Sequence, residues 1–216
     1  MKLQELSRRT GTPVSTVKYW LREGLLHPGA KRNATTAAYD ASHVERLELI
    51  TTLRQVVGLP VEQVRTVVDA VRNPDIPPAQ LMGITQATVL GLPTVPSDAG
   101  PTADAGGAVT ASGIIAAMGW TAGGEAATAA LDAELRRMAD WGLAPDMGTA
   151  LVYARAADQV ADFEMELPPL TGLTRDRLAL FVARGVFGYA QLLQRLLAVA
   201  QSSAALRAAG RGRPPE

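Results

Sequence analysis

Residues 10–33 read TGTPVSTVKYWLREGLLHPGAKRN, and this stretch decides how the chain is interpreted. Gly11 permits a tight turn, because glycine adopts the left-handed backbone at no steric cost. Thr12 is the expected N-cap, and Pro13 suits the first helical position, where its missing N–H costs little. The pattern predicts a short helix over 13–23, entered from a tight turn.

The predicted helix has two chemically different faces when successive residues are placed 100° apart. Its inward stripe holds Val14, Val17 and Leu21. Its other side is polar or cationic, with Ser15, Thr16, Tyr19 and Arg22, and with Lys18 and Trp20 on opposite flanks. Hydroxyl, phenol and cationic groups bond phosphate oxygens and base edges, so DNA is the predicted partner. The alternative is an ordinary solvated helix face.

The charge distribution supports a polyanion-binding head. The net charge is zero, but residues 1–74 carry 11 Lys+Arg against 7 Asp+Glu (+4), and residues 75–216 carry 10 against 14 (−4). All three lysines lie within the first 31 residues. A basic N-terminal part joined to an acidic remainder favours nucleic-acid binding by the first part alone.

Composition excludes several other classes of protein. The chain has no cysteine and two histidines, His27 and His43, so no metal centre and no cofactor are predicted. It holds no GxSxG, P-loop or GxGxxG motif, and an enzyme is therefore not expected. No signal peptide and no membrane-spanning run is recognised, which predicts a cytoplasmic protein.

Hydrophobic periodicity predicts a mainly α-helical chain. A small hairpin is expected over 25–40, with Leu25–His27 and Ala37–Tyr39 extended. Core positions of the next two helices are predicted at Val44, Leu47, Ile50, Leu53, Val56, Val57, Val61, Val64, Val67, Val68 and Val71. The predicted helices span 3–9, 13–23, 41–57, 60–72, 111–119, 123–142, 146–166 and 174–207, with a short apolar segment at 79–91.

The domain division follows from these elements and from the Pro- and Gly-rich stretches. Residues 1–73 form the predicted DNA-binding domain, and 74–110 a connection with a short helix. Residues 111–208 form an all-α bundle for effector binding, dimerisation or both, and 209–216 a disordered tail. The stretch DRLALFVARGVFGYAQLLQRLLAVA is apolar nearly all round, so its helix is predicted to be central in the bundle or shared between subunits.

The first third of the chain resembles a known family. LQELSRRTG, VSTVKYWLREGLL, Ala38-Tyr39-Asp40 and VERLELITTLRQVVGLPVEQVRTVV are similar to the winged helix-turn-helix domain of the mercury-resistance-regulator (MerR) family of transcription factors. The resemblance implies that the second helix enters the major groove, while the hairpin forms a wing that grips flanking phosphates. It assigns DNA contacts to Ser15, Thr16, Lys18, Tyr19, Arg22, Lys31, Arg32, Tyr39 and, further out, Arg54.

Two departures from the family pattern shape the predictions. Trp20 and Leu21 stand where the family usually has a tyrosine and an acid, and Trp20 is expected to pack between helix and wing. Pro74, Pro77 and Pro78 interrupt the region in which family members carry their long dimerisation helix.

The resemblance implies a sequence-specific transcriptional regulator that binds a promoter operator as a homodimer and affects RNA polymerase indirectly. A small-molecule effector is predicted in the helical domain, lined by Trp120, Trp141, Tyr153, Phe163, Phe181, Phe187 and Tyr189. Core packing is the alternative role for these aromatic residues, and Asp158, Asp162, Glu164 and Glu166 are expected on a solvated face. The alternative function is an effector-independent architectural or developmental regulator, whose C-terminal domain serves dimerisation or protein partners.

Overall fold

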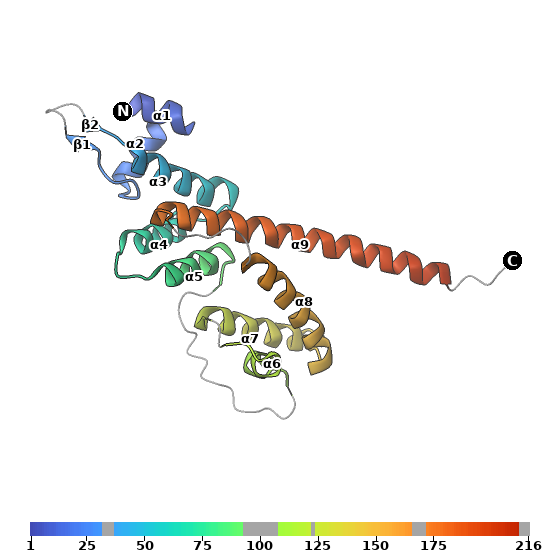
Figure 1. Cartoon of the computed structure of the whole chain (residues 1–216). Coiled ribbons are helices and arrows are strands. Elements are labelled where there is room, and N and C mark those ends of the chain that lie inside the picture. Colours follow the sequence, from blue (N-terminus) through green and yellow to red (C-terminus); the bar gives the residue numbers. More distant parts are fainter. Residues whose placement is uncertain (32–36, 93–107, 122–123, 166–171, 212–216) are drawn as a thin grey trace. The chain divides into compact units, whose positions relative to one another are not determined.

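A computed structural model describes residues 1–31, 37–92, 108–121, 124–165 and 172–211. It is mainly α-helical with one small antiparallel sheet, as predicted (Figure 1). The elements are α1 (Leu3–Thr10), α2 (Val14–Arg22), β1 (Ala30–Lys31), β2 (Ala37–Ala38), α3 (Ala41–Thr51), the π-helix η1 (Thr52–Val56), α4 (Val61–Arg72), α5 (Pro78–Val89), α6 (Ala111–Met118), α7 (Glu125–Asp140), α8 (Met147–Met165) and α9 (Arg175–Arg211).

The chain divides into two compact units. Unit 1 comprises Met1–Asp69 and Asp176–Glu216, and unit 2 comprises Ala70–Arg175. Residues 93–107 of the predicted 74–110 connection and residues 212–216 of the predicted tail lie outside the described residues. No helix in the described ranges is both long enough and apolar enough to cross a bilayer.

The core of unit 1 forms from the predicted apolar faces of the first four helices. It includes Leu6, Val17, Val44, Leu47, Ile50, Leu53, Val64, Val67 and Val68, all buried. Gly11 and Gly58 take positive φ values of 64° and 87°, and each allows the chain to turn between helices. The predicted periodicity therefore identifies most of this core correctly.

The predicted helix over 41–57 is wrong in its last turn. The α-helix ends at Thr51, and η1 follows with π-type geometry. A π-turn contains more residues than an α-turn, so it rotates later side chains off the original face. Val56 is consequently 56% exposed instead of buried, and Leu59 is buried after the turn.

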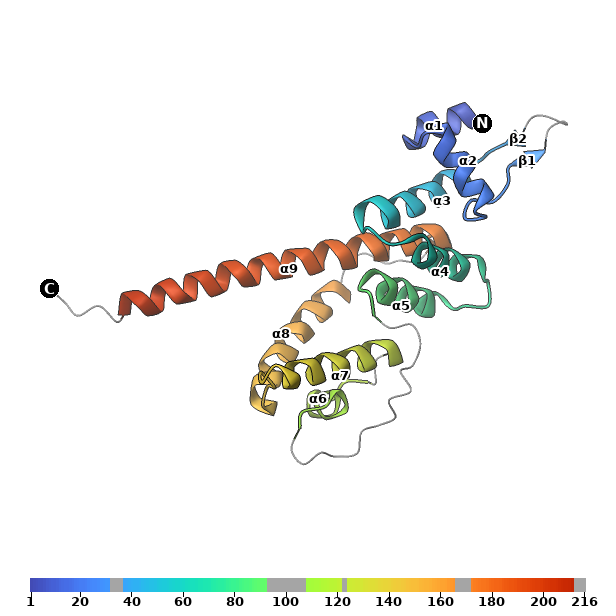
Figure 2. The same cartoon turned by 180° about the vertical axis from the view of Figure 1, so that it is seen from behind.

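Helix α9 packs its first turns against α3, as Figures 1 and 2 show from opposite sides. Arg46 of α3 pairs with Asp176 of α9, and its Nη1 also donates to the Leu25 carbonyl at 3.3 Å. Arg177 Nε lies 2.8 Å from Glu45 Oε1, which adds a second ion pair between the same helices. Within one chain α9 is buried only over Leu178–Ala183, apart from Phe181, and the leucines beyond Tyr189 are exposed, so it is not central in a bundle along its whole length.

Unit 2 contains a small cluster of buried apolar side chains on α6 and α8. Its centre is Ile114, Ala150 and Ala154, and the partly buried Trp120 and Met147 pack around it. The Trp120 indole Nε1 donates to Asp158 Oδ1 at 2.5 Å, so this carboxylate is tied to the cluster instead of lying on a purely solvated face. Glu166 lies outside the described residues.

Arg175 closes the C-terminal end of α4 within unit 2. Its guanidinium donates three hydrogen bonds of 2.8 Å, to the carbonyl oxygens of Ala70, Val71 and Ile76. The last carbonyls of a helix have no intrahelical partner, so a guanidinium at this point satisfies and stabilises them.

Candidate nucleic-acid interface

Helix α2 turns its apolar side inward and its polar side to solvent. Val17 and Trp20 are buried, while Ser15, Lys18 and Arg22 are exposed and Thr16 and Tyr19 are half-buried. The predicted stripe of Val14, Val17 and Leu21 is wrong at both ends, since Val14 and Leu21 are only half-buried. The Trp20 indole takes the inward place instead, with its ring centroid 4.6 Å from that of Tyr19.

Helix α2 begins after Pro13 and ends before Gly24, and an arginine far away in the sequence contacts its C-terminal end. Pro13 is the N-cap residue, so the predicted Thr12 cap is wrong, and Thr12 is buried instead. At the other end Gly24 takes a φ of 70° and lets the chain reverse. Arg65 of α4 donates to the Glu23 carbonyl at 2.9 Å, which fixes the end of α2 against α4.

The role of Arg65 has no local signature in the sequence. This residue lies 42 positions from Glu23 and looks like any exposed helical arginine in the sequence. Only the folded chain brings it to the C-terminal end of α2, where its Nη2 also lies 3.4 Å from the Glu23 carboxylate.

Strands β1 and β2 form the predicted hairpin; β2 begins at Ala37 as predicted, whereas β1 begins at Ala30 and not at Leu25. Their register pairs Ala30 with Ala38 and Lys31 with Ala37, so the predicted first strand over Leu25–His27 is wrong. Leu25 and Leu26 are instead buried, and their N–H groups donate to the Trp20 carbonyl at 3.0 and 3.1 Å. The two leucines therefore belong to the core under α2.

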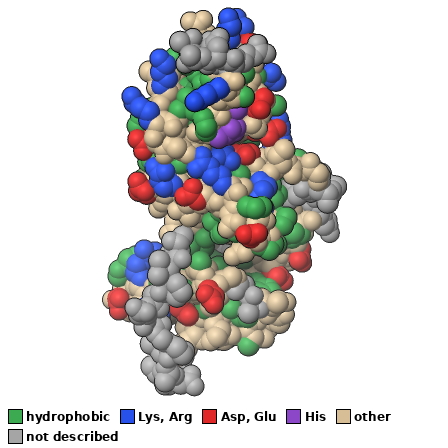
Figure 3. Space-filling model, turned by 90° about the vertical axis from the view of Figure 1, so that its left-hand side faces the viewer, with side chains coloured by type: hydrophobic (Ala, Val, Ile, Leu, Met, Phe, Trp, Pro, Cys, Tyr) green, Lys and Arg blue, Asp and Glu red, His purple; other side chains and the backbone are tan. Residues whose placement is uncertain are grey.

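Lys31 is exposed at the wing, and Arg32 lies outside the described residues. Figure 3 shows several Lys and Arg side chains on the face of unit 1 around the wing. Lys18, Arg22 and Lys31 make no hydrogen bond or ion pair within the described ranges, whereas Arg46 and Arg65 are paired with carboxylates. Unpaired cations are available to phosphates, and this separates the three residues from the structural arginines.

Two predicted contact residues are engaged in the fold. Tyr39 is 7% exposed, its ring packs edge-on against His43, and its N–H donates to the Met1 carbonyl at 2.9 Å. Arg54 donates from Nη1 to the Leu59 carbonyl across the turn that contains Gly58. Both residues shape the surface around α2 rather than present a free polar group on it.

Gly29 allows the wing to close. A Cβ built on this residue would lie 2.7 Å from the Ala38 carbonyl oxygen, closer than real Cβ atoms approach a neighbouring backbone. We expect Gly29→Ala to push β2 away from β1 and so to shift Lys31 of β1. Operator binding should weaken about tenfold, which is the loss of roughly one good contact. Electrophoretic mobility shifts measure this, and Gly83→Ala is the control because a Cβ there meets nothing within 4 Å. Equal operator affinity in Gly29→Ala would contradict the role of the wing.

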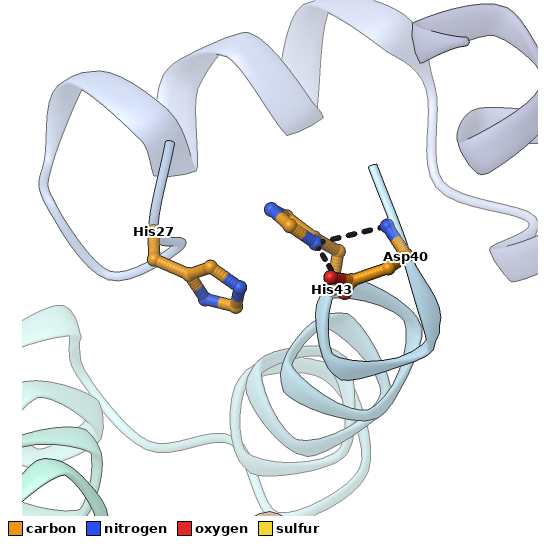
Figure 4. A group of neighbouring side chains, drawn as sticks. All are labelled: His27, Asp40 and His43. Carbon is orange, nitrogen blue, oxygen red and sulfur yellow. Dashed lines mark hydrogen bonds and ion pairs between the residues drawn. The ribbon is translucent and has the colours of Figure 1, made fainter. Parts of the chain in front are cut away.

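His27, Asp40 and His43 lie at the foot of the wing (Figure 4). Asp40 caps α3 by accepting the Ser42 N–H at 3.0 Å, and His43 Nδ1 accepts the Asp40 N–H at 3.2 Å. The Ser42 hydroxyl donates to Asp40 Oδ1 at 2.5 Å, and this hydrogen bond together with the neighbouring His43 holds the pKa of the Asp40 carboxyl below its usual range. Burial, followed by the charges of His43 and Arg46, lowers the pKa of His27. Asp40 and His43 have the spacing of a capping box at the start of α3, with histidine in place of the usual Glu or Gln, and this spacing is the sequence signal for their contact.

The seven aromatic residues predicted to line an effector site are divided between the two units. Trp120, Trp141, Tyr153 and Phe163 lie in unit 2, and Phe181, Phe187 and Tyr189 lie in unit 1. Trp141, Tyr153 and Phe163 are 62–63% exposed, so the alternative prediction of core packing is wrong for them. Trp120 alone packs on the cluster of unit 2.

Comparisons with known proteins agree with this geometry. A family model described as MerR HTH family regulatory protein matches residues 1–71. The crystal structure of SCO5550 from Streptomyces coelicolor A3(2), a proposed transcriptional regulator, is similar at 26% identity and a TM-score of 0.64, covering all of both chains. A search of curated proteins found no match.

These similarities confirm the predicted resemblance and the expectation of a regulator rather than an enzyme. Residues 1–71 are a MerR-type helix-turn-helix domain, and the chain is a DNA-binding transcriptional regulator.

Proposed function

We propose that α2 lies in the major groove of an operator and contacts it through Ser15, Thr16, Lys18, Tyr19 and Arg22. Lys31 and Arg32 of the wing then grip the neighbouring phosphates. One observation carries the proposal. The exposed face of α2 presents a hydroxyl group and two cations with no partner in the described ranges, while its opposite face is anchored by Val17 and Trp20.

The double variant Lys18→Ala/Arg22→Ala tests these contacts. Removing two phosphate-neutralising cations is expected to lower the slope of log affinity against log salt by about 2. Operator affinity at physiological salt should fall roughly tenfold to a hundredfold, which corresponds to about 1.4–2.7 kcal/mol in total. Fluorescence anisotropy with a labelled operator at several salt concentrations measures both quantities.

Arg155→Ala is the matched control, because Arg155 is an exposed helical arginine of unit 2. It should leave the affinity and the salt slope unchanged. An unchanged slope in Lys18→Ala/Arg22→Ala, with the fold intact by circular dichroism, would rule out this binding face.

We propose further that two copies pair through α9. From Tyr189 onward one series of exposed apolar residues follows alternating three- and four-residue steps, which is the spacing of a coiled-coil seam, and the exposed Leu193 and Leu197 lie beside it. The seam comprises Tyr189, Leu192, Leu196, Val199 and Leu206, with Ser203 at one position. Over 18 residues it extends for about 27 Å, at 1.5 Å of rise per residue. A second copy fits this seam because it offers the same apolar surface, and two-fold symmetry matches a pseudo-palindromic operator.

This dimer uses a different segment from the one interrupted by Pro74, Pro77 and Pro78. Analytical ultracentrifugation tests it directly, since a dimer should persist at micromolar concentration. Footprints of two half-sites separated by a whole number of helical turns would support the same symmetry on DNA.

For unit 2, the exposed aromatic residues favour a protein partner over an enclosed small molecule. Trp141, Tyr153 and Phe163 offer their rings to solvent, as expected of a docking surface. A protein partner is therefore the first candidate for unit 2, and a small-molecule effector is the second. A small molecule that raises the melting temperature of the protein and quenches its tryptophan fluorescence would favour the effector.

A further inference from the structure

The only two histidines of the 216-residue chain meet in space, although 16 positions separate them in the sequence. The ring centroids of His27 and His43 are 3.9 Å apart. Asp40 lies beside them, with Oδ1 2.8 Å from His43 Nδ1. One donor atom of each of the three side chains lies within 4.8 Å of the donor atoms of the other two.

The cluster is not fully satisfied by the protein. The His43 side chain is 3% exposed, and its Nε2 is buried with no hydrogen-bond partner within the described part of the chain. A buried polar atom without a partner is uncommon in folded proteins and indicates a water molecule or an ion nearby. Asp40, with a 73% exposed side chain, leaves the cluster open to solvent. Figure 3 likewise shows histidine atoms at the surface of this unit.

We propose that His27, Asp40 and His43 form a binding site for a divalent transition-metal ion, with Zn²⁺ as the best fit. Two imidazoles and one carboxylate are a donor set that Zn²⁺ prefers, and sites with three protein ligands leave one position for water. Ligand atoms around a tetrahedral Zn²⁺ lie about 3.3 Å apart, which follows from metal–ligand distances of 2.0–2.2 Å.

Small side-chain movements bring the three residues to this geometry. The Ser42 hydroxyl now lies 3.0 Å from His27 Nε2 and 2.5 Å from Asp40 Oδ1, between two of the donor groups. An ion replaces these hydrogen bonds. His43 is fixed by its burial, whereas His27 is half-buried and Asp40 is exposed, so the latter two adjust to the ion. The nearby Arg46 charge is opposed by Asp176, which limits its repulsion of a cation.

Binding would close the wing at its base. His27 precedes β1 and Asp40 follows β2, so one ion bridges the two ends of the hairpin and ties them to the start of α3. The site therefore links metal binding to the position of Lys31 beside α2. The inference concerns metal binding alone and does not depend on the proposed DNA contacts.

The experiment uses the full chain without a polyhistidine tag. Titration with Co²⁺ should give d–d absorption bands that saturate at one ion per chain, and Zn²⁺ should displace Co²⁺. Because the chain has two histidines, nitrogen-15 NMR of the imidazoles should show two ring systems, both shifted by Zn²⁺, and identify the His43 nitrogen that binds.

Two variants test the ligands without disturbing the core. His27→Gln and Asp40→Asn should each weaken Zn²⁺ binding at least about tenfold. Mutation of a residue that only hydrogen-bonds to a metal ligand already lowers metal affinity by about that factor, and these two residues are proposed ligands themselves. Asparagine remains a good N-cap, so Asp40→Asn should keep α3 intact. Asp75→Asn, a carboxylate-to-amide change elsewhere, should bind like the parent chain. Non-saturating titration, or parental affinity in both His27→Gln and Asp40→Asn, would overturn the proposal.

Discussion

Replacing Leu192 and Leu196 by glutamate is expected to convert a dimer into a monomer. In the proposed pair each residue moves from an exposed position, 50% and 57% accessible, into a helix–helix seam. Complete burial of a leucine side chain contributes about 1.5–3 kcal/mol, so these half-exposed residues contribute about half of that each, and a two-fold pair loses four of them. The loss of at least about 3 kcal/mol corresponds to a dimer dissociation constant raised by more than two orders of magnitude.

Operator binding should weaken when the dimer dissociates, because an isolated copy reaches only one half-site. We expect at least a hundredfold loss of apparent affinity, with the first turns of α9 still packed on α3. Gln191→Glu/Gln194→Glu is the matched control, since it adds the same charges to positions off the seam. If Leu192→Glu/Leu196→Glu sediments as a dimer, the seam is not the interface. If the monomer binds a half-site with intact α2 contacts, the DNA-binding face stands independently of the dimer.

Local sequence patterns predicted much of unit 1 correctly. Glycine and proline mark the turn before α2, and apolar spacing identifies the inward faces of α3 and α4 because each helix buries one stripe. The polar face of α2 followed from the same arithmetic. The apolar face of α2 was predicted less accurately, since helical periodicity did not reveal that Trp20 is buried while Leu21 is half-buried.

The errors arise where tertiary contacts override local pattern. A π-turn changes the phase of α3 without any glycine or proline to mark it, so Val56 was misplaced. Tyr39 matches the family pattern of the wing, yet its ring is used to pack on His43. In unit 2 helical spacing of aromatic residues suggested core or pocket, and the structure leaves Tyr153 and Phe163 exposed.

Contacts between distant segments were beyond prediction from this sequence. Arg46 and Asp176 are 130 positions apart, and neither stands out in composition or spacing. An arginine within an apolar helical face would ordinarily be placed at the edge of the core, with its charge in water. Helix α9 supplies the carboxylate that allows this arginine to be buried in unit 1.

Arg46→Ala is accordingly expected to destabilise unit 1 strongly. The Arg46 and Asp176 side chains are 6% and 16% exposed, and Nη2 of the arginine lies 3.1 Å from Asp176 Oδ2. Removing one member of a buried ion pair leaves the other charge without its partner, at a cost of about 3–5 kcal/mol. The Leu25 carbonyl would also lose its hydrogen bond from Arg46. Urea denaturation followed by circular dichroism measures the change in the free energy of unfolding.

Glu45 and Arg177 provide an internal control on the same two helices. The side chain of Glu45 is 16% exposed, like that of Asp176, but Arg177 is 52% exposed against 6% for Arg46, so water screens this pair more and it should contribute less, about 1 kcal/mol. A double-mutant cycle on Arg46→Ala and Asp176→Ala should give a large coupling energy, and a cycle on Glu45→Ala and Arg177→Ala a small one. Equal coupling in both cycles would show that burial does not strengthen the Arg46 pair. A large coupling energy for the Arg46 pair alone means that separating α9 from α3 would leave a buried arginine without its partner. The helix proposed to join two copies is then fixed to the helix that supports the wing.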